Sequence, residues 1–264
     1  MQYHIDTHVH VYHCYEPGTL LNEASLNSNR SGPGANLILC LTESRGFNFF
    51  QYLKDQLKTQ KPIAGWSLSE IAKQPAILLR SDNQNIIIVA GRQVITKQGL
   101  EVLALFSDQT YDDGRDIQSI IDQINENVGI AVLPWGVGKW LGSRGAIIEK
   151  ILNDNEPGKL AIADISARPA LWPQPGQFRI ARESGYNCLY GTDPLPIGYE
   201  QHRVANAGMI MELPSDIAEA VAELKNRLLQ QTENQYYGNR VSTLRFIKDQ
   251  LMLRLNRQPC VPGH

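Results

Sequence analysis

The sequence lacks the features that mark membrane-spanning, secreted and nucleic-acid-binding proteins. No run approaches 18 uninterrupted apolar residues, and no basic leader with an apolar core stands at the start, so neither a membrane span nor an export signal is predicted. The formal net charge is -2 and the pI is near 6.3. This balance gives no reason to expect a nucleic acid or an anionic membrane as partner.

Cysteine is also scarce, and no two cysteines have the Cys-x-x-Cys spacing of a zinc or redox motif. The chain has four, at Cys14, Cys40, Cys188 and Cys260. Two of them lie in apolar runs that are typical of buried strands. We therefore expect reduced thiols and a cytoplasmic protein.

Apolar runs of strand length recur through the 264 residues, enough chain for one large core. The runs lie at residues 3–10, 37–41, 76–79, 86–90, 100–106, 129–134, 160–165, 188–190 and 208–213. Helical spacing appears at Ile117, Ile120, Ile121 and Ile124, at Ile217, Val221, Leu224 and Leu228, and at Leu244, Ile247, Leu251 and Leu255. We expect these stripes to be core faces. The alternation predicts an α/β protein with a parallel sheet covered on both sides, either a barrel or a doubly wound sheet.

Two segments depart from this alternation, and a third ends it. Residues 17–35 are rich in Gly, Asn and Ser and predict a long loop, either a lid or a plain surface excursion. Between residues 76 and 106 the strands follow too closely for helices, which predicts an inserted β-meander. We expect one domain over residues 1–257 and a frayed tail over 258–264.

The most informative feature is the pair His8 and His10 at the end of the first predicted strand. Side chains two residues apart on a strand point to the same side, so both imidazoles can reach one cation. Catalytic groups of α/β barrels lie at such strand ends. Spacing alone leaves the alternative open that this is an ordinary half-buried strand.

Four stretches, in order, resemble the polymerase and histidinol phosphatase (PHP) superfamily of metal-dependent phosphoesterases. Residues 6–10, Asp-Thr-His-Val-His, resemble its opening motif, and residues 191–194, Gly-Thr-Asp-Pro, resemble its late Gly-Ser-Asp motif. Residues 39–44 fall at its Thr-Asp-His strand, and residues 91–96 at its Gly-x-Glu motif. The first and last motifs also suit the broader amidohydrolase barrels. The resemblance implies a distorted TIM-like (β/α)7 barrel that carries the β-meander as an insertion.

The departures from the family pattern reduce the ligand set that the resemblance implies. Glu43 and Ser44 stand for Asp-His, Gln93 stands for Glu, and Glu101 falls near a later His. No histidine lies between His13 and His202. The remaining set is His8, His10 and Asp193, with Glu43 as a further carboxylate. It implies one divalent ion, Zn, Mn or Fe, or none, and leaves open whether Asp193 is a ligand or a general base.

Four cations fall at or beyond the ends of predicted strands, where a barrel would gather them on one face. They are Arg45, Arg92, Lys139 and Arg168. We expect Arg92 and Lys139 to stabilise a leaving anion, and Arg45 and Arg168 to bind substrate, with Trp135 stacking on it. The alternatives are solvated surface charges and a tryptophan that caps the core.

Two hypotheses follow from these residues. The first is a metal-dependent hydrolase of a small anionic ester, specifically a phosphoesterase. The second is a metal-free barrel that binds a phosphorylated or carboxylated ligand. Arg92 beside Gln93 favours the second, because a guanidinium would repel a nearby metal ion. Under both hypotheses the partner is a small anionic molecule, with no nucleic acid and no membrane.

Overall fold

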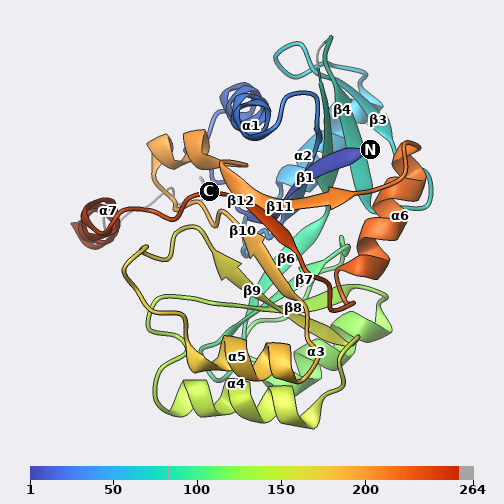
Figure 1. The fold of residues 1–264 in the computed structure, drawn as a ribbon. Helices are drawn as coiled ribbons and strands as arrows, with labels where there is room; N and C mark the ends of the chain where they lie inside the picture. Colours follow the sequence, from blue (N-terminus) through green and yellow to red (C-terminus); the bar gives the residue numbers. More distant parts are fainter. Residues whose placement is uncertain (83, 256–264) are drawn as a thin grey trace.

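Two β-sheets share one apolar core, and in residues 1–82 and 84–255, which the computed structural model describes, their strands do not close into a barrel (Figure 1). The first sheet has seven strands in the order β12-β11-β1-β2-β5-β4-β3, and the second has five in the order β10-β9-β8-β7-β6. The predicted (β/α)7 barrel is therefore wrong. The predicted tail lies outside the described residues.

The strands lie close to the apolar runs of the sequence. The first sheet contains β1 (Gln2–Val9), β2 (Asn36–Leu41), β3 (Ser67–Glu70), β4 (Ala76–Arg80), β5 (Asn85–Val89), β11 (Ala207–Glu212) and β12 (Gln235–Gly238). The second contains β6 (Gly91–Ile95), β7 (Glu101–Leu105), β8 (Ile130–Pro134), β9 (Leu160–Ile165) and β10 (Cys188–Gly191). Only β1–β2, β2–β5, β8–β9 and β9–β10 pair in parallel, so both sheets are mixed.

The predicted β-meander is also wrong, because the chain changes sheets inside it. β4 and β5 form an antiparallel hairpin in the first sheet, and β6 and β7 form another in the second. Only Ala90 separates β5 from β6, which leaves no room for a crossover helix. A parallel bridge between Glu43 and Arg92 ties the end of β2 to β6. The two sheets therefore meet along a seam.

Helices cover the outer faces of both sheets. The helices of the described residues are α1 (Pro17–Ser31), α2 (Phe49–Lys58), α3 (Ile117–Glu126), α4 (Ser143–Asp154), α5 (Gly176–Glu183), α6 (Ile217–Arg227), α7 (Thr243–Leu255) and the 3-10 helix η1 (Gly198–Arg203). α1 and α2 pack on the first sheet, and α3, α4 and α5 pack on the second. α6 contributes to the core that the two sheets share.

The predicted loop at residues 17–35 is largely the helix α1, contrary to expectation. Its N-cap, Glu16, accepts hydrogen bonds from the amides of Gly18 and Thr19, and Pro17 occupies the first helical position, where its missing N–H costs nothing. Leu20 and Leu21 are buried against the first sheet. Burial of this apolar stripe therefore outweighs the low helix propensity of the Ser and Asn residues.

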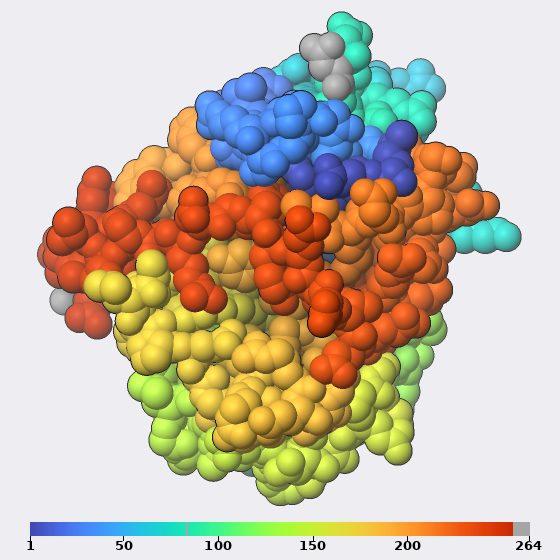
Figure 2. Space-filling model, in the orientation of Figure 1, coloured from blue at the N-terminus to red at the C-terminus, as the bar shows by residue number. Residues whose placement is uncertain are grey.

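α7 is a helix as predicted, but its apolar stripe is not a core face. Leu244, Ile247, Leu251 and Leu255 are 81%, 49%, 52% and 79% exposed. The helix stands apart from the two sheets, at the edge of the molecule (Figures 1 and 2). Helical spacing identified the secondary structure here, but it did not identify the side that packs.

The thiols follow the prediction only in part. Cys40 and Cys188 are free, whereas Cys14 is disulfide-bonded, so the expectation of four reduced thiols is wrong for Cys14. Within the described part of the chain, no helix combines the length and apolar character that crossing a membrane requires.

Candidate metal centre

Three side chains that are far apart in the sequence bring their donor atoms to one point. His8 Nε2 lies 3.1 Å from His10 Nε2, and Asp193 Oδ1 lies 3.4 Å from each of these nitrogens. Zinc bonds of about 2.0–2.1 Å in a tetrahedral site place neighbouring ligand atoms about 3.3 Å apart. The three atoms therefore have the spacing of one face of a metal coordination tetrahedron, and these residues can hold a metal ion.

The histidine pair is positioned by β1 and by the carboxylate of Asp6 at the seam. Asp6 is fully buried and accepts hydrogen bonds from His8 N, Thr192 N, Thr192 Oγ1 and Ala205 N. These bonds join β1 to the segment that follows β10. Gly191 permits the close approach, because a Cβ there would lie 2.5 Å from His8 N. Asp6 and Gly191 therefore set the distance between the imidazoles and Asp193.

Asp193 reaches the pair through an unusual backbone conformation. Its φ is 48°, in the left-handed region that Asp adopts more readily than most residues. Its amide donates to the carbonyl of His8 at 2.9 Å. A turn stabilised in this way directs the carboxylate back over β1.

Burial sets the protonation of the three groups. It lowers the pKa of His8 to about 4 and that of His10 to about 3, so both imidazoles are neutral near pH 7, as metal ligation requires. Burial raises the pKa of Asp193, while His10, Lys139 and Arg203 act in the opposite direction. His8 Nδ1 is buried without a hydrogen-bond partner, which departs from the second-layer support that ligating histidines usually have.

A second layer of polar groups lies beside the imidazoles. Gln93 lies beside both histidines and favours their protonated forms, and its Nε2 donates to Glu101 Oε1 at 3.3 Å. Glu101 forms an ion pair with Lys139. Gln93 and Glu101, where the family pattern has a Glu and a His, thus both take part in the site.

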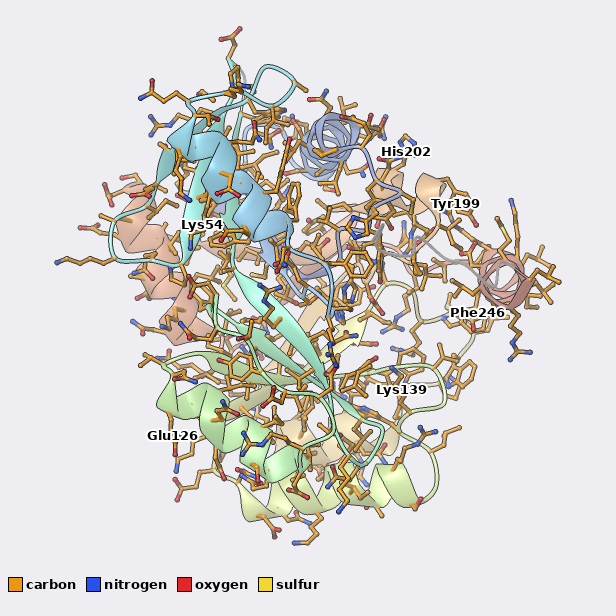
Figure 3. The ribbon with its side chains drawn as sticks, turned by 180° about the vertical axis from the view of Figure 1, so that it is seen from behind. Lys54, Glu126, Lys139, Tyr199, His202 and Phe246 are labelled. Carbon is orange, nitrogen blue, oxygen red and sulfur yellow. The ribbon has the colours of Figure 1, made fainter. Side chains whose placement is uncertain are left out.

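A pocket of about 290 Å³ opens beside this cluster and includes His10, Glu101, Lys139 and Asp193 in its wall. α7 covers it with the side chains Phe246, Asp249, Gln250 and Leu253. Asp249 accepts a hydrogen bond from Tyr199, and Arg245 pairs with Glu200 at 2.9 Å. Phe246 and Tyr199 both lie on the α7 side of the molecule (Figure 3). The helix thus uses its polar and aromatic side to cover the pocket.

Among the predicted site residues, Glu43 lies outside the ligand group that the described residues form. Its carboxylate accepts hydrogen bonds from the Phe49 and Phe50 amides at the start of α2, and Arg92 pairs with it at 3.2 Å. Arg92 also donates to the carbonyl of Phe47. Both predicted groups therefore hold α2 in place, and Arg92 is neutralised by Glu43.

Two of the other predicted cations, Arg45 and Arg168, are also placed away from the imidazoles. Arg168 is fully buried and pairs with Asp164 through Nε at 2.8 Å and Nη2 at 2.5 Å. Trp135 is buried in the core of the second sheet, beneath the Arg168 guanidinium. Arg45 is exposed and lines a separate pocket beside Arg92. Of the four predicted cations, Lys139 alone lines the pocket that contains His10 and Asp193.

Arg203 is a site residue that the sequence reasoning missed. It lines the same pocket, pairs with Glu200 at 2.6 Å and donates to Ser166 Oγ at 3.0 Å. It belongs to η1, a short 3-10 helix with no apolar periodicity. No pattern in the sequence distinguishes this buried arginine from the arginines of the surface.

No known protein family and no curated protein matches the sequence of this chain. Its fold is similar to that of PsfC from Pseudomonas syringae PB-5123, with a TM-score of 0.59, 13% identity and coverage of 97% of this chain and 98% of that one. It is also similar to the lesion-specific endonuclease PfuEndoQ from Pyrococcus furiosus, with a TM-score of 0.53 and 12% identity. That match covers 89% of this chain and 58% of the endonuclease. At such low identity the likeness concerns the fold.

Proposed function

We propose that the protein is a metal-dependent hydrolase of a small anionic ester, specifically a phosphoesterase. The observation that carries the proposal is the triangle formed by His8 Nε2, His10 Nε2 and Asp193 Oδ1, with sides of 3.1, 3.4 and 3.4 Å. A divalent ion held there supplies Lewis-acid chemistry, which polarises the scissile bond and generates a nucleophile from water near neutral pH. Three protein ligands leave a coordination position for water or substrate.

The charges of the pocket favour the hydrolase over a metal-free anion binder. Among the described residues, the charged side chains in its wall are Lys139 and Arg203 against Glu101, Asp193 and Asp249. Without an added cation, this wall carries one more negative than positive charge and would repel an anion. A divalent ion reverses the sign, so an anionic ligand requires the metal ion here.

The chain's own residues have distinct roles in this proposal. Lys139 presents its ammonium group to the pocket and is held there by Glu101, so it binds the phosphoryl oxygens and stabilises the charge that develops on them. Tyr12 lies in the wall and stacks on His10 with ring centroids 5.4 Å apart. It limits the motion of that imidazole. Asp193 stays either a ligand or a general base.

The size of the pocket and the fold neighbours support a small phosphoester. A volume of about 290 Å³ beneath α7 suits a substrate at the lower end of the size range of ligand pockets. One neighbour is an endonuclease, and endonucleases cleave phosphodiesters. In the present chain α7 covers the approach to the pocket, which favours a small molecule over a nucleic acid strand.

The test combines metal analysis with turnover. Protein purified without chelator is analysed for Zn, Mn and Fe by plasma mass spectrometry and assayed with p-nitrophenyl phosphate. We expect about one ion per chain and metal-dependent turnover, both lost in His8→Ala. Asp193→Ala should lose turnover, and it should also lose the ion if Asp193 is a ligand rather than a general base. His202→Ala is the matched control, because His202 is exposed and pairs with Glu23 away from the cluster. Metal-free wild-type protein whose melting temperature rises with phosphate would contradict the proposal and support the binding module.

A further inference from the structure

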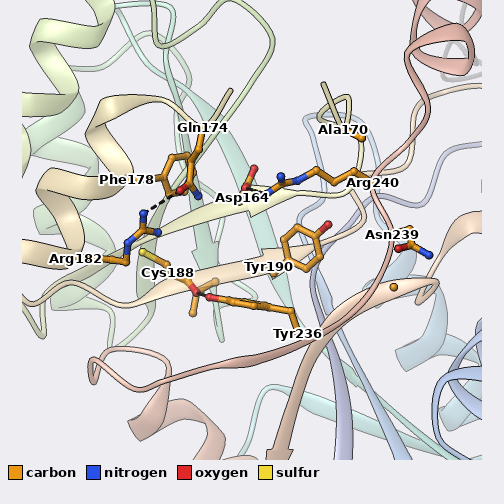
Figure 4. Close-up of a pocket in the computed structure, with 12 residues that line it drawn as sticks. Asp164, Ala170, Gln174, Phe178, Arg182, Cys188, Tyr190, Tyr236, Asn239 and Arg240 are labelled. Carbon is orange, nitrogen blue, oxygen red and sulfur yellow. Dashed lines mark hydrogen bonds and ion pairs between the residues drawn. The ribbon is translucent and has the colours of Figure 1, made fainter. Parts of the chain in front are cut away.

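A second pocket, of about 390 Å³, lies between α5, β10 and the segment around β12 (Figure 4). Its wall shares no residue with the pocket of the metal centre. The proposed hydrolase does not use it. Its lining combines arginines and aromatic rings, which is the composition of a ligand site more than of a surface depression.

One end of this pocket carries an uncompensated positive charge. Asp164 Oδ2 accepts from Arg168 Nη2 at 2.5 Å and from Arg240 Nη2 at 2.8 Å. One carboxylate thus serves two guanidiniums, and that of Arg168 is fully buried. Arg240 Nε is buried and has no hydrogen-bond partner. A buried donor without an acceptor is unfavourable, so this end is suited to an additional anionic group.

The other end carries a positive charge with neutral partners. Arg182 Nη2 donates to the amide oxygen of Gln174 at 2.9 Å, and Arg182 acts to lower the pKa of the Cys188 thiol, which burial raises. The pocket wall contains no carboxylate besides Asp164 among the described residues. Arg182 is therefore a second cationic group, and it has no carboxylate partner among the described residues of the wall. It lies at the opposite end of the pocket from Arg240 (Figure 4).

Aromatic rings lie between these ends. Tyr190 and Tyr236 meet edge to face with centroids 5.4 Å apart, and Phe178 lines the wall near Arg182. Tyr236 is fixed by its hydroxyl, which donates to the carbonyl of Cys188 at 2.8 Å. Rings in this arrangement favour a flat apolar body.

We propose that this pocket binds a small planar organic dianion, with one anionic group at Arg240, the other at Arg182, and the flat body against Tyr190 and Tyr236. Arginine suits both ends, because its planar fork of donors matches carboxylate and phosphate groups. The proposal does not depend on the hydrolase activity.

The test uses terephthalate as a two-ended probe and benzoate as a one-ended control. Binding to the full chain is measured by calorimetry and by protection of Cys188 from iodoacetamide, read on its peptide by mass spectrometry. Cys188 is suited as reporter because it is a free, partly exposed thiol in the pocket wall. Protection is compared with and without probe within each variant, because Arg182 itself affects the reactivity of Cys188.

We expect terephthalate to bind more tightly than benzoate and to protect Cys188. Arg182→Gln and Arg240→Gln should each weaken binding about tenfold, the usual size for loss of a charge-assisted hydrogen bond. Arg179→Gln is the matched control, because Arg179 lies on the same helix, is exposed and pairs with Glu183 outside the pocket. Arg182 is exposed, so its variant should fold even if Arg240→Gln does not.

A further control separates the two pockets. The two pockets are neighbours, because Ile165 and Val241 line the pocket of the metal centre and directly follow Asp164 and Arg240, which line the second pocket. A variant of the first pocket is therefore needed to show which pocket the probe occupies. Lys139→Gln should leave terephthalate binding unchanged if the probe occupies the second pocket. The proposal is overturned if millimolar terephthalate does not bind, if benzoate binds equally well, if Arg179→Gln weakens binding as much as Arg182→Gln, or if Lys139→Gln abolishes binding.

Discussion

Replacement of Asp6 by Asn tests whether burial or hydrogen bonding has the larger effect on this carboxylate, which lies at the seam between the sheets. Asp6 Oδ1 accepts from His8 N and Thr192 N, and Oδ2 accepts from Thr192 Oγ1 and Ala205 N. In Asp6→Asn, Oδ1 keeps both of its donors and the Thr192 hydroxyl can turn to accept from the new amide. The amide of Ala205 alone loses its acceptor. Relative to the ionised carboxylate, this loss should destabilise the fold by about 1–3 kcal/mol, to which the titration of Asp6 adds a pH-dependent part.

The pH dependence of the variant follows from the pKa of Asp6. Burial raises this pKa to about 6, although four hydrogen bonds act in the opposite direction. Unfolded Asp titrates near 3.9, so between these values the native state binds more protons than the unfolded state. The contribution of Asp6 to stability is therefore full at low pH and is lost as pH rises through 6. From pH 4 to 7 the wild type should lose about 2–3 kcal/mol that the variant does not lose.

The assay is urea denaturation of both proteins from pH 4 to 7, in the presence of a chelator so that metal binding does not contribute. The difference between their unfolding free energies isolates Asp6, because other titrating groups such as His8 and His10 contribute to both proteins. Asp55→Asn is the control: the Lys58 hydrogen bond lowers the pKa of Asp55, so Asp55 is ionised in both states from pH 5 to 7 and the difference should stay flat. If instead the unfolding free energy of the wild type rises relative to that of Asp6→Asn as pH rises, the hydrogen bonds to Asp6 outweigh its burial and the reasoning is refuted.

Four further outcomes follow from the structure. Glu43→Gln should keep the metal content and lose about 1–3 kcal/mol of stability by urea denaturation, because Glu43 accepts from the first amides of α2. Lys139→Met should raise KM for p-nitrophenyl phosphate about tenfold, and an unchanged KM would place the phosphoryl group elsewhere. Leu224→Ala should cost about 2–5 kcal/mol and Leu251→Ala less than about 0.5, since the first is buried and the second is 52% exposed; equal losses would contradict the placement of α7. Metal-free wild type should lose stability as pH falls from 6.5 towards 4, because burial lowers the pKa of His10 to about 3. In the same urea series, the unfolding free energy of His10→Ala should fall less over this pH range.

Strands were predictable from the sequence, but their pairing was not. A buried strand such as β8 is continuously apolar whether its neighbours run parallel or antiparallel, so the sequence pattern is the same in a barrel and in two mixed sheets. The deciding feature is local: Ala90 alone separates β5 from β6, so the chain steps from one sheet to the other. The exposed stripe of α7 has a similar cause, because periodicity shows that a helix has an apolar side but not that anything covers it.

The positions of the site residues were predictable where strand geometry fixes them. They were unpredictable where a long charged side chain can form an ion pair with more than one partner. His8 in β1 and His10, the residue directly after β1, share a side by strand parity, and their imidazoles do meet at 3.1 Å. For Glu43 and Arg168 the sequence shows a charge near a strand end, but the charge is taken up by an ion pair, with Arg92 in one case and Asp164 in the other. A long side chain can reach several partners, and which it meets depends on packing that spacing does not encode.

The triangle of donor atoms does not require a closed barrel, because hydrogen bonds across the seam replace the missing closure. Asp193 is held by its amide on the His8 carbonyl, and its neighbour Thr192 is held twice by Asp6. These bonds join the end of β1 in one sheet to the end of β10 in the other. Gly191 lets the two backbones approach, and a Cβ there would meet His8 N at 2.5 Å. A substitution that widens the seam should therefore abolish metal binding before it unfolds either sheet, since each sheet keeps its own helices and its own outer core.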